Sequence, residues 1–169
     1  MAFNMLNFEF NSARSIAVER GGVTRLAARL KARGHRRVLV VTDAGVLAAG
    51  LLEAPVGGLR KEGVDVAVYS SVVADPPEGV IKEAVAAAMT HRADCVVGFG
   101  GGSSMDAAKL AALLACSGES LDTAYGINQA KGPRLPLVLI PTTAGTGSEV
   151  TPISIVTTGE GEKKGVVSP

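Results

Sequence analysis

Two loops rich in glycine and hydroxyl side chains are the parts of this sequence best suited to chemistry. Residues 98–109 have the sequence GFGGGSSMDAAK, and residues 141–149 have the sequence PTTAGTGSE. Consecutive glycines let the backbone approach a ligand closely, because no Cβ atom intervenes. Amides at the start of a helix favour a phosphate, and hydroxyl groups bond phosphate or ribose oxygens without adding charge. Both loops therefore predict binding of a phosphate-bearing ligand.

The first loop departs from two well-known phosphate-binding patterns. It is not a Walker A loop, because no Lys-Ser or Lys-Thr follows the glycines at the required distance. It also lacks the usual dinucleotide fingerprint, since Ser103 replaces the third glycine and the loop follows a later strand than the first. A simpler interpretation is a tight turn with Ser103 or Ser104 as the helix cap. The spacing of Asp106 and Lys109 also fits an ordinary surface pair.

Asp43 is a third candidate, because it follows the first clear apolar strand. A carboxylate at that point can accept both hydroxyls of an adenosine ribose and repel a 2′-phosphate, which favours NAD over NADP. The alternative is that Asp43 is the N-cap of a helix that begins at Ala44.

These candidates depend on elements that alternate along the chain. Short β-rich runs, two of them apolar almost throughout as in parallel strands buried on both faces, predict strands at 38–42, 64–69, 94–99 and 135–140. Between them, helices are expected at 23–33, at 44–61 with a break at Pro55, at 76–91 and at 103–117. This order predicts right-handed βαβ units in a doubly wound, mostly parallel, Rossmann-like α/β sheet.

Local signals refine the ends of these elements. Asp75 can cap the third helix, with Pro76 in its first turn and Glu78 at capping-box spacing. Gly34 can adopt the left-handed conformation that ends the first helix. After the fourth strand, residues 153–157 and 164–167 predict a C-terminal β-hairpin with its turn at 159–161.

Composition limits the classes of function. The 169 residues are 47% hydrophobic, 4% aromatic and 20% charged, as expected for one globular domain. A net charge of +1 gives no basic surplus for nucleic acid, and the basic residues at 31–37 fit a solvated surface. No apolar run is long enough to span a membrane, and the start of the chain has no signal-peptide pattern. Cys95 and Cys116 lie in apolar segments, which predicts two small buried side chains in a cytoplasmic protein.

The segments FGGGSSMDAAK and PTTAGTGSEVTPISIV together resemble the iron-containing alcohol dehydrogenase family. They lie about 40 residues apart and each follows a predicted strand. The similarity runs from a short first strand near residues 7–10 to the hairpin at the end. Polyol dehydrogenases such as glycerol dehydrogenases, maleylacetate reductases and dehydroquinate-synthase-like enzymes share the same fold and are alternatives within it.

The resemblance implies a dinucleotide site, with NAD preferred to NADP. Asp43 matches the position that contacts the adenosine ribose, and Asp75 falls where the family often has an asparagine near the cofactor. The pyrophosphate loop is matched by Gly101, Gly102, Ser103 and Asp106. The loop beside the nicotinamide half is matched by Thr142, Thr143, Thr146, Ser148 and Thr151, with Ile153 and Lys164 as weaker contacts.

The resemblance also implies reversible hydride transfer between an alcohol or aldehyde and the nicotinamide, assisted by Fe²⁺ or Zn²⁺. In the family, an Asp and three His in a helical second domain bind the metal, and the early strand is often involved in dimerisation. Here that strand, at 7–10, implies a homodimer. The only histidines, His35 and His91, stand beside arginines at predicted helix ends, so we expect helix-terminal roles for them.

We therefore expect residues 1–169 to be the dinucleotide-binding domain of a protein roughly twice as long, without the helical metal-binding domain and inactive alone. The chain stops at Ser168-Pro169, directly after a predicted strand. A different class of function stays open, namely a nucleotide-binding module that performs no chemistry. A still simpler alternative is an α/β scaffold whose glycine loop is only a turn.

Overall fold

A four-stranded parallel sheet forms the centre of the structure. The computed structural model describes residues 12–159 and 161–169. The strands are β1 (Arg37–Asp43), β2 (Asp65–Val72), β3 (Cys95–Gly100) and β5 (Leu137–Pro141), in the spatial order β2-β1-β3-β5. Each neighbouring pair is parallel. The predicted α/β fold and all four predicted strands are confirmed.

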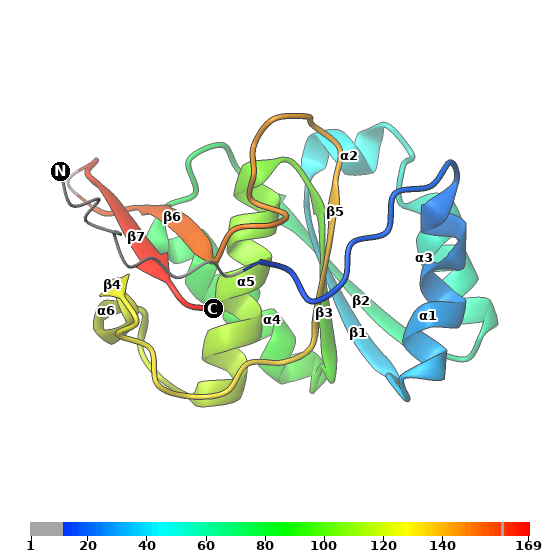
Figure 1. Cartoon of the computed structure of the whole chain (residues 1–169), viewed down its shortest axis with the longest axis horizontal. Helices are drawn as coiled ribbons and strands as arrows, with labels where there is room; N and C mark the ends of the chain where they lie inside the picture. Colours follow the sequence, from blue (N-terminus) through cyan, green and yellow to red (C-terminus); the bar gives the residue numbers. More distant parts are fainter. Residues whose placement is uncertain (1–11, 160) are drawn as a thin grey trace, which may run out of the picture.

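Helices cover both faces of this sheet (Figure 1). One face carries the 3₁₀ helix η1 (Gly22–Arg25), α1 (Leu26–Ala32) and α3 (Glu53–Lys61), and the other carries α4 (Glu78–His91) and α5 (Gly102–Ser117). Side chains alternate along a strand, so Leu39 and Val41 pack towards α4 and α5, while Val38 and Val40 pack towards α1 and α3. Burial on both faces explains the continuous apolar run from Val38 to Val41 in β1.

The segment between β1 and β2 forms two helices, but the predicted break at Pro55 is wrong. The first helix is α2 (Ala44–Ala48), and α3 begins at Glu53, so the break lies at residues 49–52. Gly50 has a positive φ of 70° in this turn. Pro55 is accommodated in the first turn of α3, where its missing N–H has no intrahelical acceptor to lose.

Helix α4 begins two residues later than predicted, and the predicted cap by Asp75 is wrong. The N-cap is Pro77, with no side-chain hydrogen bond, and Asp75 has a φ of 49°. Two consecutive prolines explain this difference, because a residue that precedes proline is disfavoured in the helical region. The predicted end of the first helix is confirmed, since Gly34 follows α1 with a φ of 82°.

A small second sheet packs on the opposite side of α5 from the main sheet (Figure 1). It contains β4 (Gly126–Ile127), which follows the short α6 (Leu121–Ala124), and the antiparallel hairpin of β6 (Ile153–Thr157) and β7 (Lys163–Val167). The predicted hairpin is confirmed, although residue 160 of its turn lies outside the described residues. The strand expected near residues 7–10 also lies outside them.

The two cysteines differ from each other. Cys95 is buried in β3, as predicted, whereas Cys116 is exposed near the end of α5, so the prediction that both are buried is wrong. Within residues 12–159 and 161–169, the structure contains no helix long and apolar enough to cross a membrane.

Candidate functional site

The sheet topology brings the two glycine-containing loops to one edge. From β1 the chain passes to β2 on one side, and it then returns to β3 on the other side of β1. Ligands of open α/β sheets bind outside the carboxyl ends of the strands, where the strand order reverses in this way. Asp43 is the last residue of β1, Gly100 of β3 and Pro141 of β5, so the carboxyl ends of these three strands lie at the same edge of the sheet. The Thr142 amide donates to the Gly100 carbonyl over 2.9 Å and ties the two loops together.

The first loop presents bare backbone at the start of a long helix. Helix α5 has Gly101 as its N-cap and begins at Gly102, with no side-chain cap hydrogen bond. The alternative in which Ser103 or Ser104 caps this helix is therefore wrong. Because the first amides of an α-helix have no intrahelical acceptor, the N–H groups of Gly102, Ser103 and Ser104 can bond an anion.

The second loop lies over these glycines and lines the space with hydroxyl groups. A Cβ atom on Gly101 would lie 3.4 Å from Thr143 Oγ1. A Cβ atom on Gly102 would lie 3.3 Å from Ser148 Oγ and 3.5 Å from Thr146 Cβ. We call these five residues the glycine cradle. Its backbone amides and hydroxyls match the oxygens of a pyrophosphate, and a side chain on either glycine would occupy part of its space.

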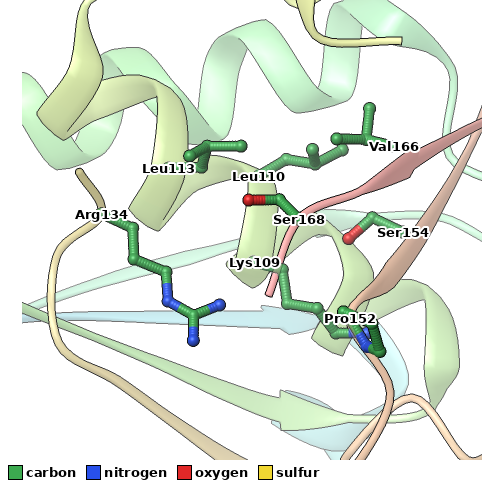
Figure 2. Close-up of a pocket in the computed structure, with 8 residues that line it drawn as sticks. All are labelled: Lys109, Leu110, Leu113, Arg134, Pro152, Ser154, Val166 and Ser168. Atoms are coloured by element: carbon green, nitrogen blue, oxygen red, sulfur yellow. The ribbon is translucent and has the colours of Figure 1, made fainter. Parts of the chain in front are cut away.

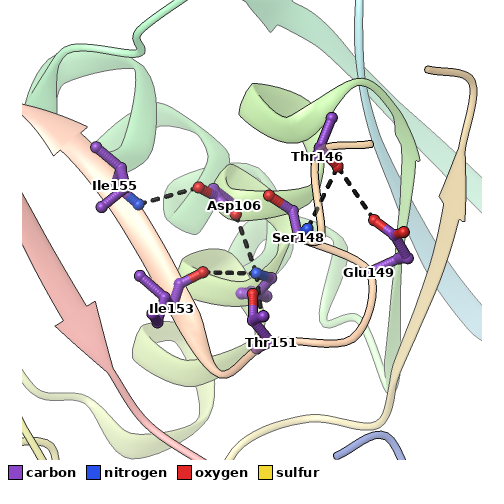
Figure 3. A network of polar contacts seen from close by, with 8 residues as sticks. Asp106, Thr146, Ser148, Glu149, Thr151, Ile153 and Ile155 are labelled. Carbon is purple, nitrogen blue, oxygen red and sulfur yellow. Dashed lines mark hydrogen bonds and ion pairs between the residues drawn. The ribbon is translucent and has the colours of Figure 1, made fainter. Parts of the chain in front are cut away.

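Thr146 differs from the other hydroxyl residues of the glycine cradle. Its Oγ1 donates to Glu149 Oε2 over 3.1 Å and accepts from the Ser148 amide over 3.3 Å (Figure 3). A hydroxyl group has a single proton to donate. While Glu149 accepts that proton, Thr146 cannot donate to a phosphate oxygen, so the amides and the other hydroxyls must supply the donors.

Asp43 accepts two hydrogen bonds, one from a nearby backbone amide and one from a side chain distant in the sequence. Its Oδ1 accepts from the Val46 amide over 2.9 Å, which confirms the N-cap alternative for α2. Its Oδ2 accepts from Ser104 Oγ over 3.0 Å. A carboxylate has about four acceptor positions, so each oxygen keeps one for a further donor. The N-cap role and the predicted ribose contact are therefore compatible, and the ribose contact stays a prediction.

Asp106 and Lys109 are a buried pair, so the alternative of an ordinary surface pair is wrong. Both side chains are at least nine-tenths buried, and Lys109 Nζ lies 3.0 Å from Asp106 Oδ1. Lys109 also donates to the carbonyls of Thr151 and Ile153, over 3.2 and 2.6 Å. Asp106 Oδ2 accepts from the Ile155 amide over 3.0 Å (Figure 3). The pair thus fastens β6 and the residues before it to α5.

The surroundings of Lys109 are suited to structure rather than to ligand binding. Burial lowers the pKa of the Lys109 ammonium, and the Asp106 carboxylate offsets part of this effect. A cavity of about 10 Å³ lies beside Lys109, with aliphatic side chains gathered on one side (Figure 2). It is lined by Lys109, Leu110, Leu113, Arg134, Pro152, Ser154, Val166 and Ser168. This volume is close to the minimum for one water molecule and far too small for a nucleotide.

Four other predicted site residues lie in or beside the hairpin, where they contact Lys163, Tyr125 or Lys109. Asp75 is exposed, and its carboxylate bonds Lys163 Nζ over 2.7 Å. Lys164 Nζ lies 5.6 Å from the centre of the Tyr125 ring. Thr151 and Ile153 are exposed, and their carbonyls bond Lys109. Their roles towards a cofactor stay predictions, as does that of Asp106.

Ser104, Gly100 and Glu149 are site features that the sequence analysis did not assign. Ser104 and Gly100 lie inside the glycine motif, but their shared partner, Asp43, is about 60 residues away in the chain. The available signal was the direction of helical side chains, which tilt towards the N-terminus and so carry Ser104 back towards the strand ends. Glu149 carried no signal beyond its place in the loop.

No metal centre is formed by the described part of the chain. It contains no group of three or more His, Cys, Asp or Glu side chains arranged to hold a metal ion. His35 Nδ1 lies 3.8 Å from Asp94 Oδ1, and His91 ends α4 with Nε2 3.2 Å from the Asp65 carbonyl. Both histidines therefore lie at or just beyond helix ends, as predicted.

Comparison with known proteins gives one consistent result. The family model described as iron-containing alcohol dehydrogenase matches residues 13–169. The chain is 38% identical over 153 residues to the NAD-dependent methanol dehydrogenase of Bacillus methanolicus, and the match covers 90% of this chain and 40% of that protein. It is 42% identical over 139 residues to long-chain-alcohol dehydrogenase 1 of Geobacillus thermodenitrificans, covering 80% of this chain and 35% of that protein.

Solved structures agree with the sequence matches. The NADH-dependent butanol dehydrogenase A of Thermotoga maritima superimposes with a TM-score of 0.87 at 30% identity. That match covers 97% of this chain and 42% of the solved chain. The present chain thus spans less than half of the length of each of these relatives.

Proposed function

The chain belongs to the iron-containing alcohol dehydrogenase family, and from this premise we propose that it binds the dinucleotide for an NAD-dependent alcohol dehydrogenase. The whole protein would transfer a hydride reversibly between an alcohol and NAD. Of the three similar proteins described above, two are named as NAD-dependent or NADH-dependent, and all three are named as dehydrogenases of an alcohol. These names support the class of reaction, and the particular alcohol is not part of the proposal.

The glycine cradle is the observation that carries this proposal. Its amide at Gly102, the adjacent amide of Ser103, and its hydroxyls at Thr143 and Ser148 would bind the pyrophosphate. Asp43 would accept the hydroxyls of the adenosine ribose and disfavour a 2′-phosphate, so that NAD is preferred. When bound, the nicotinamide supplies the hydride acceptor.

The remaining predicted contacts extend this site towards the nicotinamide half. Thr142 follows β5 directly, and Thr151 and Ile153 stand at the start of β6. The Asp106–Lys109 pair fixes the backbone of Thr151 and Ile153. We propose that these residues line the path of the cofactor towards the substrate, with Lys164 further along the hairpin and Asp75 beside it, bonded to Lys163.

The described residues do not fit a metal centre, so we assign the Fe²⁺ or Zn²⁺ site of the whole enzyme to residues outside this chain. The alcohol site is proposed to lie there too, because this chain spans 40% or less of the relatives matched by sequence. We therefore propose that these 169 residues alone bind the dinucleotide without oxidising an alcohol. A homodimer and a cytoplasmic location remain predictions from the sequence.

The test is an assay of the full-length protein supplied with Fe²⁺ or Zn²⁺, NAD⁺ and a series of primary alcohols of increasing length. We expect NADH to form with at least one alcohol, and more slowly when NADP⁺ replaces NAD⁺. Binding of NAD⁺ without turnover of any alcohol or aldehyde would instead favour a non-catalytic nucleotide-binding module. A protein that binds neither dinucleotide would refute the proposal.

A further inference from the structure

The contact between Asp43 and Ser104 joins the carboxyl ends of the two central strands. Ser104 lies in the first turn of α5, immediately after β3, and Asp43 is the last residue of β1. The Ser104 side chain is buried, with 1% of its surface exposed, and Oγ donates to Asp43 Oδ2 over 3.0 Å. This hydrogen bond therefore crosses the place where the strand order reverses.

Asp43 is fixed by donors from two different elements. The Val46 amide of α2 bonds one carboxylate oxygen, and the Ser104 hydroxyl of α5 bonds the other. Hydrogen bonds to an ionised carboxylate are shorter and stronger than neutral ones. Asp43 is only partly buried, and it is the last residue of β1, at the carboxyl edge of the sheet.

Gly100 provides the room for this contact. A Cβ atom at position 100 would lie 2.6 Å from Ser104 Oγ and 3.0 Å from Asp43 Oδ2. The first distance is too short for a Cβ atom and the second is very tight, so a side chain at position 100 would displace Ser104 Oγ from the hydrogen bond. Gly100 also has a φ of 153°, which side chains rarely allow. The backbone of the glycine motif is thus shaped around the Asp43–Ser104 contact as well as around the glycine cradle.

We propose that Ser104 determines the preference for NAD over NADP without touching the cofactor, by fixing the orientation of the Asp43 carboxylate. This inference rests on the proposed function. With the hydroxyl in place, the free acceptor positions of Asp43 face the ribose diol, and its charge repels a 2′-phosphate. Without the hydroxyl, the carboxylate keeps only the Val46 amide and can rotate away from both. Ser104 is a positioning residue in this scheme.

A purely structural role for Ser104 gives a different expectation. If the hydroxyl only supported the first turn of α5, its removal would disturb the pyrophosphate site that NAD⁺ and NADP⁺ share. Both affinities would then fall by the same factor. The ratio of the two affinities therefore separates positioning of Asp43 from general support of the loop.

The experiment is calorimetric titration of NAD⁺ and NADP⁺ into the full-length protein and its Ser104→Ala variant. We expect the variant to bind NAD⁺ about tenfold more weakly, because the Asp43 carboxylate loses its hydrogen bond from Ser104 and is no longer held towards the ribose. NADP⁺ should bind equally well or more tightly, because its 2′-phosphate is repelled less. Ser117→Ala, at the far end of the same helix, is the matched control and should leave both affinities unchanged. Thermal unfolding of each variant checks that it is folded.

A double-mutant cycle with Asp43→Asn completes the test. Once Asp43 carries no charge, Ser104→Ala should cause no further change in the NAD⁺ to NADP⁺ ratio. If the wild-type protein prefers NAD⁺ and Ser104→Ala keeps that preference, the role of Ser104 is refuted while the proposed function stands. If the wild-type protein binds neither dinucleotide, both fail together. A change in ratio that persists in the Asp43→Asn background also refutes the role, because it does not act through Asp43.

Discussion

The two halves of the segment 98–109 lie in one loop and helix but differ in chemistry. The first half presents glycine backbone and hydroxyl groups, and its helix end has no side-chain cap hydrogen bond. The second half contains Asp106 and Lys109, which are buried and bonded to the backbone of residues 151–155. The first half faces the carboxyl edge of the sheet, whereas the second half attaches the hairpin.

This difference suggests that ligand binding and stability are separable within twelve consecutive residues. Changes in the glycine cradle should weaken binding while the fold is preserved, because open backbone contributes little packing. Changes in the buried pair should destabilise the fold, because they leave a charge without its partner in a low-dielectric interior. The following variants test this separation.

Replacement of Lys109 by Met should have the largest effect. It leaves the Asp106 carboxylate buried without its cation and removes the donor to two carbonyls. Breaking a buried pair in this way costs about 3–5 kcal/mol. The free energy of unfolding, measured by urea titration, should fall by that amount.

Lys82→Met is the matched control, because Lys82 forms an exposed pair with Glu78 and its removal should cost less than about 1 kcal/mol. The double variant Asp106→Leu with Lys109→Met should be more stable than Lys109→Met alone, since no buried charge is left. If Lys109→Met is as stable as Lys82→Met, the buried pair is not what attaches the hairpin.

Gly102→Ala should have the opposite effect, a large loss of NAD⁺ affinity with little loss of stability. The new Cβ would lie 3.3 Å from Ser148 Oγ, inside the glycine cradle. We expect NAD⁺ affinity to fall about a hundredfold, equivalent to roughly 2.7 kcal/mol, while the free energy of unfolding changes by less than about 0.5 kcal/mol. Gly57→Ala in α3, where a Cβ meets nothing within 4 Å, is the control and should leave binding unchanged. Equal NAD⁺ affinity in both variants would argue against the glycine cradle as the pyrophosphate site.

Asp43→Ser tests the two roles of one side chain. Serine preserves the N-cap of α2, so stability should change by only a few tenths of a kcal/mol. Loss of the negative charge should reduce the preference for NAD⁺ over NADP⁺ by about tenfold. Titration with both dinucleotides measures this ratio, and an unchanged ratio would contradict the ribose role.

Tyr125→Phe should have the smallest effect, confined to the side of the hairpin away from the glycine cradle. The Tyr125 hydroxyl donates to Glu78 Oε1 over 2.8 Å and is the largest cause of the lowered pKa of Glu78. We expect the melting temperature to fall by about 2–3 °C at neutral pH, with NAD⁺ affinity unchanged.

The difference in melting temperature between the wild type and Tyr125→Phe should depend on pH in a definite direction. Because the pKa of Glu78 is lowered on folding, its contribution to stability is complete above its unfolded value and is lost as the pH falls through the folded value. The melting temperatures of the wild type and Tyr125→Phe should therefore converge as the pH is lowered below about 4.5. A difference that stays constant down to strongly acidic pH would assign it to packing of the ring instead.

Much of the fold follows from the apolar pattern, because β1 and β3 are buried on both faces and so carry continuous apolar runs. Helix starts were less predictable. Pro55 breaks no helix since it lies in a first turn, and the Pro76-Pro77 pair moves the start of α4 past the predicted cap. The rules that proline interrupts a helix and that aspartate caps one are valid in general. Both predictions failed because the true helix start lies a few residues from the predicted position.

The sequence predicted which two loops form the candidate site, but not the side-chain contacts within it. Glycines and hydroxyls mark the two loops in the sequence, and the parallel sheet brings them to one edge. The burial of Asp106 and Lys109 could not be predicted from their spacing, which is the same in an exposed pair. It depends on the hairpin that covers α5, more than forty residues later in the chain. The partner of Ser104 likewise comes from a distant strand end.

The most direct test of the central claim is hydrogen–deuterium exchange of the full-length protein with and without saturating NAD⁺. The cofactor should slow exchange at residues 100–106 and 142–151, around the glycine cradle. Exchange at the C-terminal end of α1 should stay the same, because this end leads into the amino end of β1, on the opposite edge of the sheet. Saturation by NAD⁺ with no protection in these two loops would contradict the account, since the dinucleotide would then bind elsewhere.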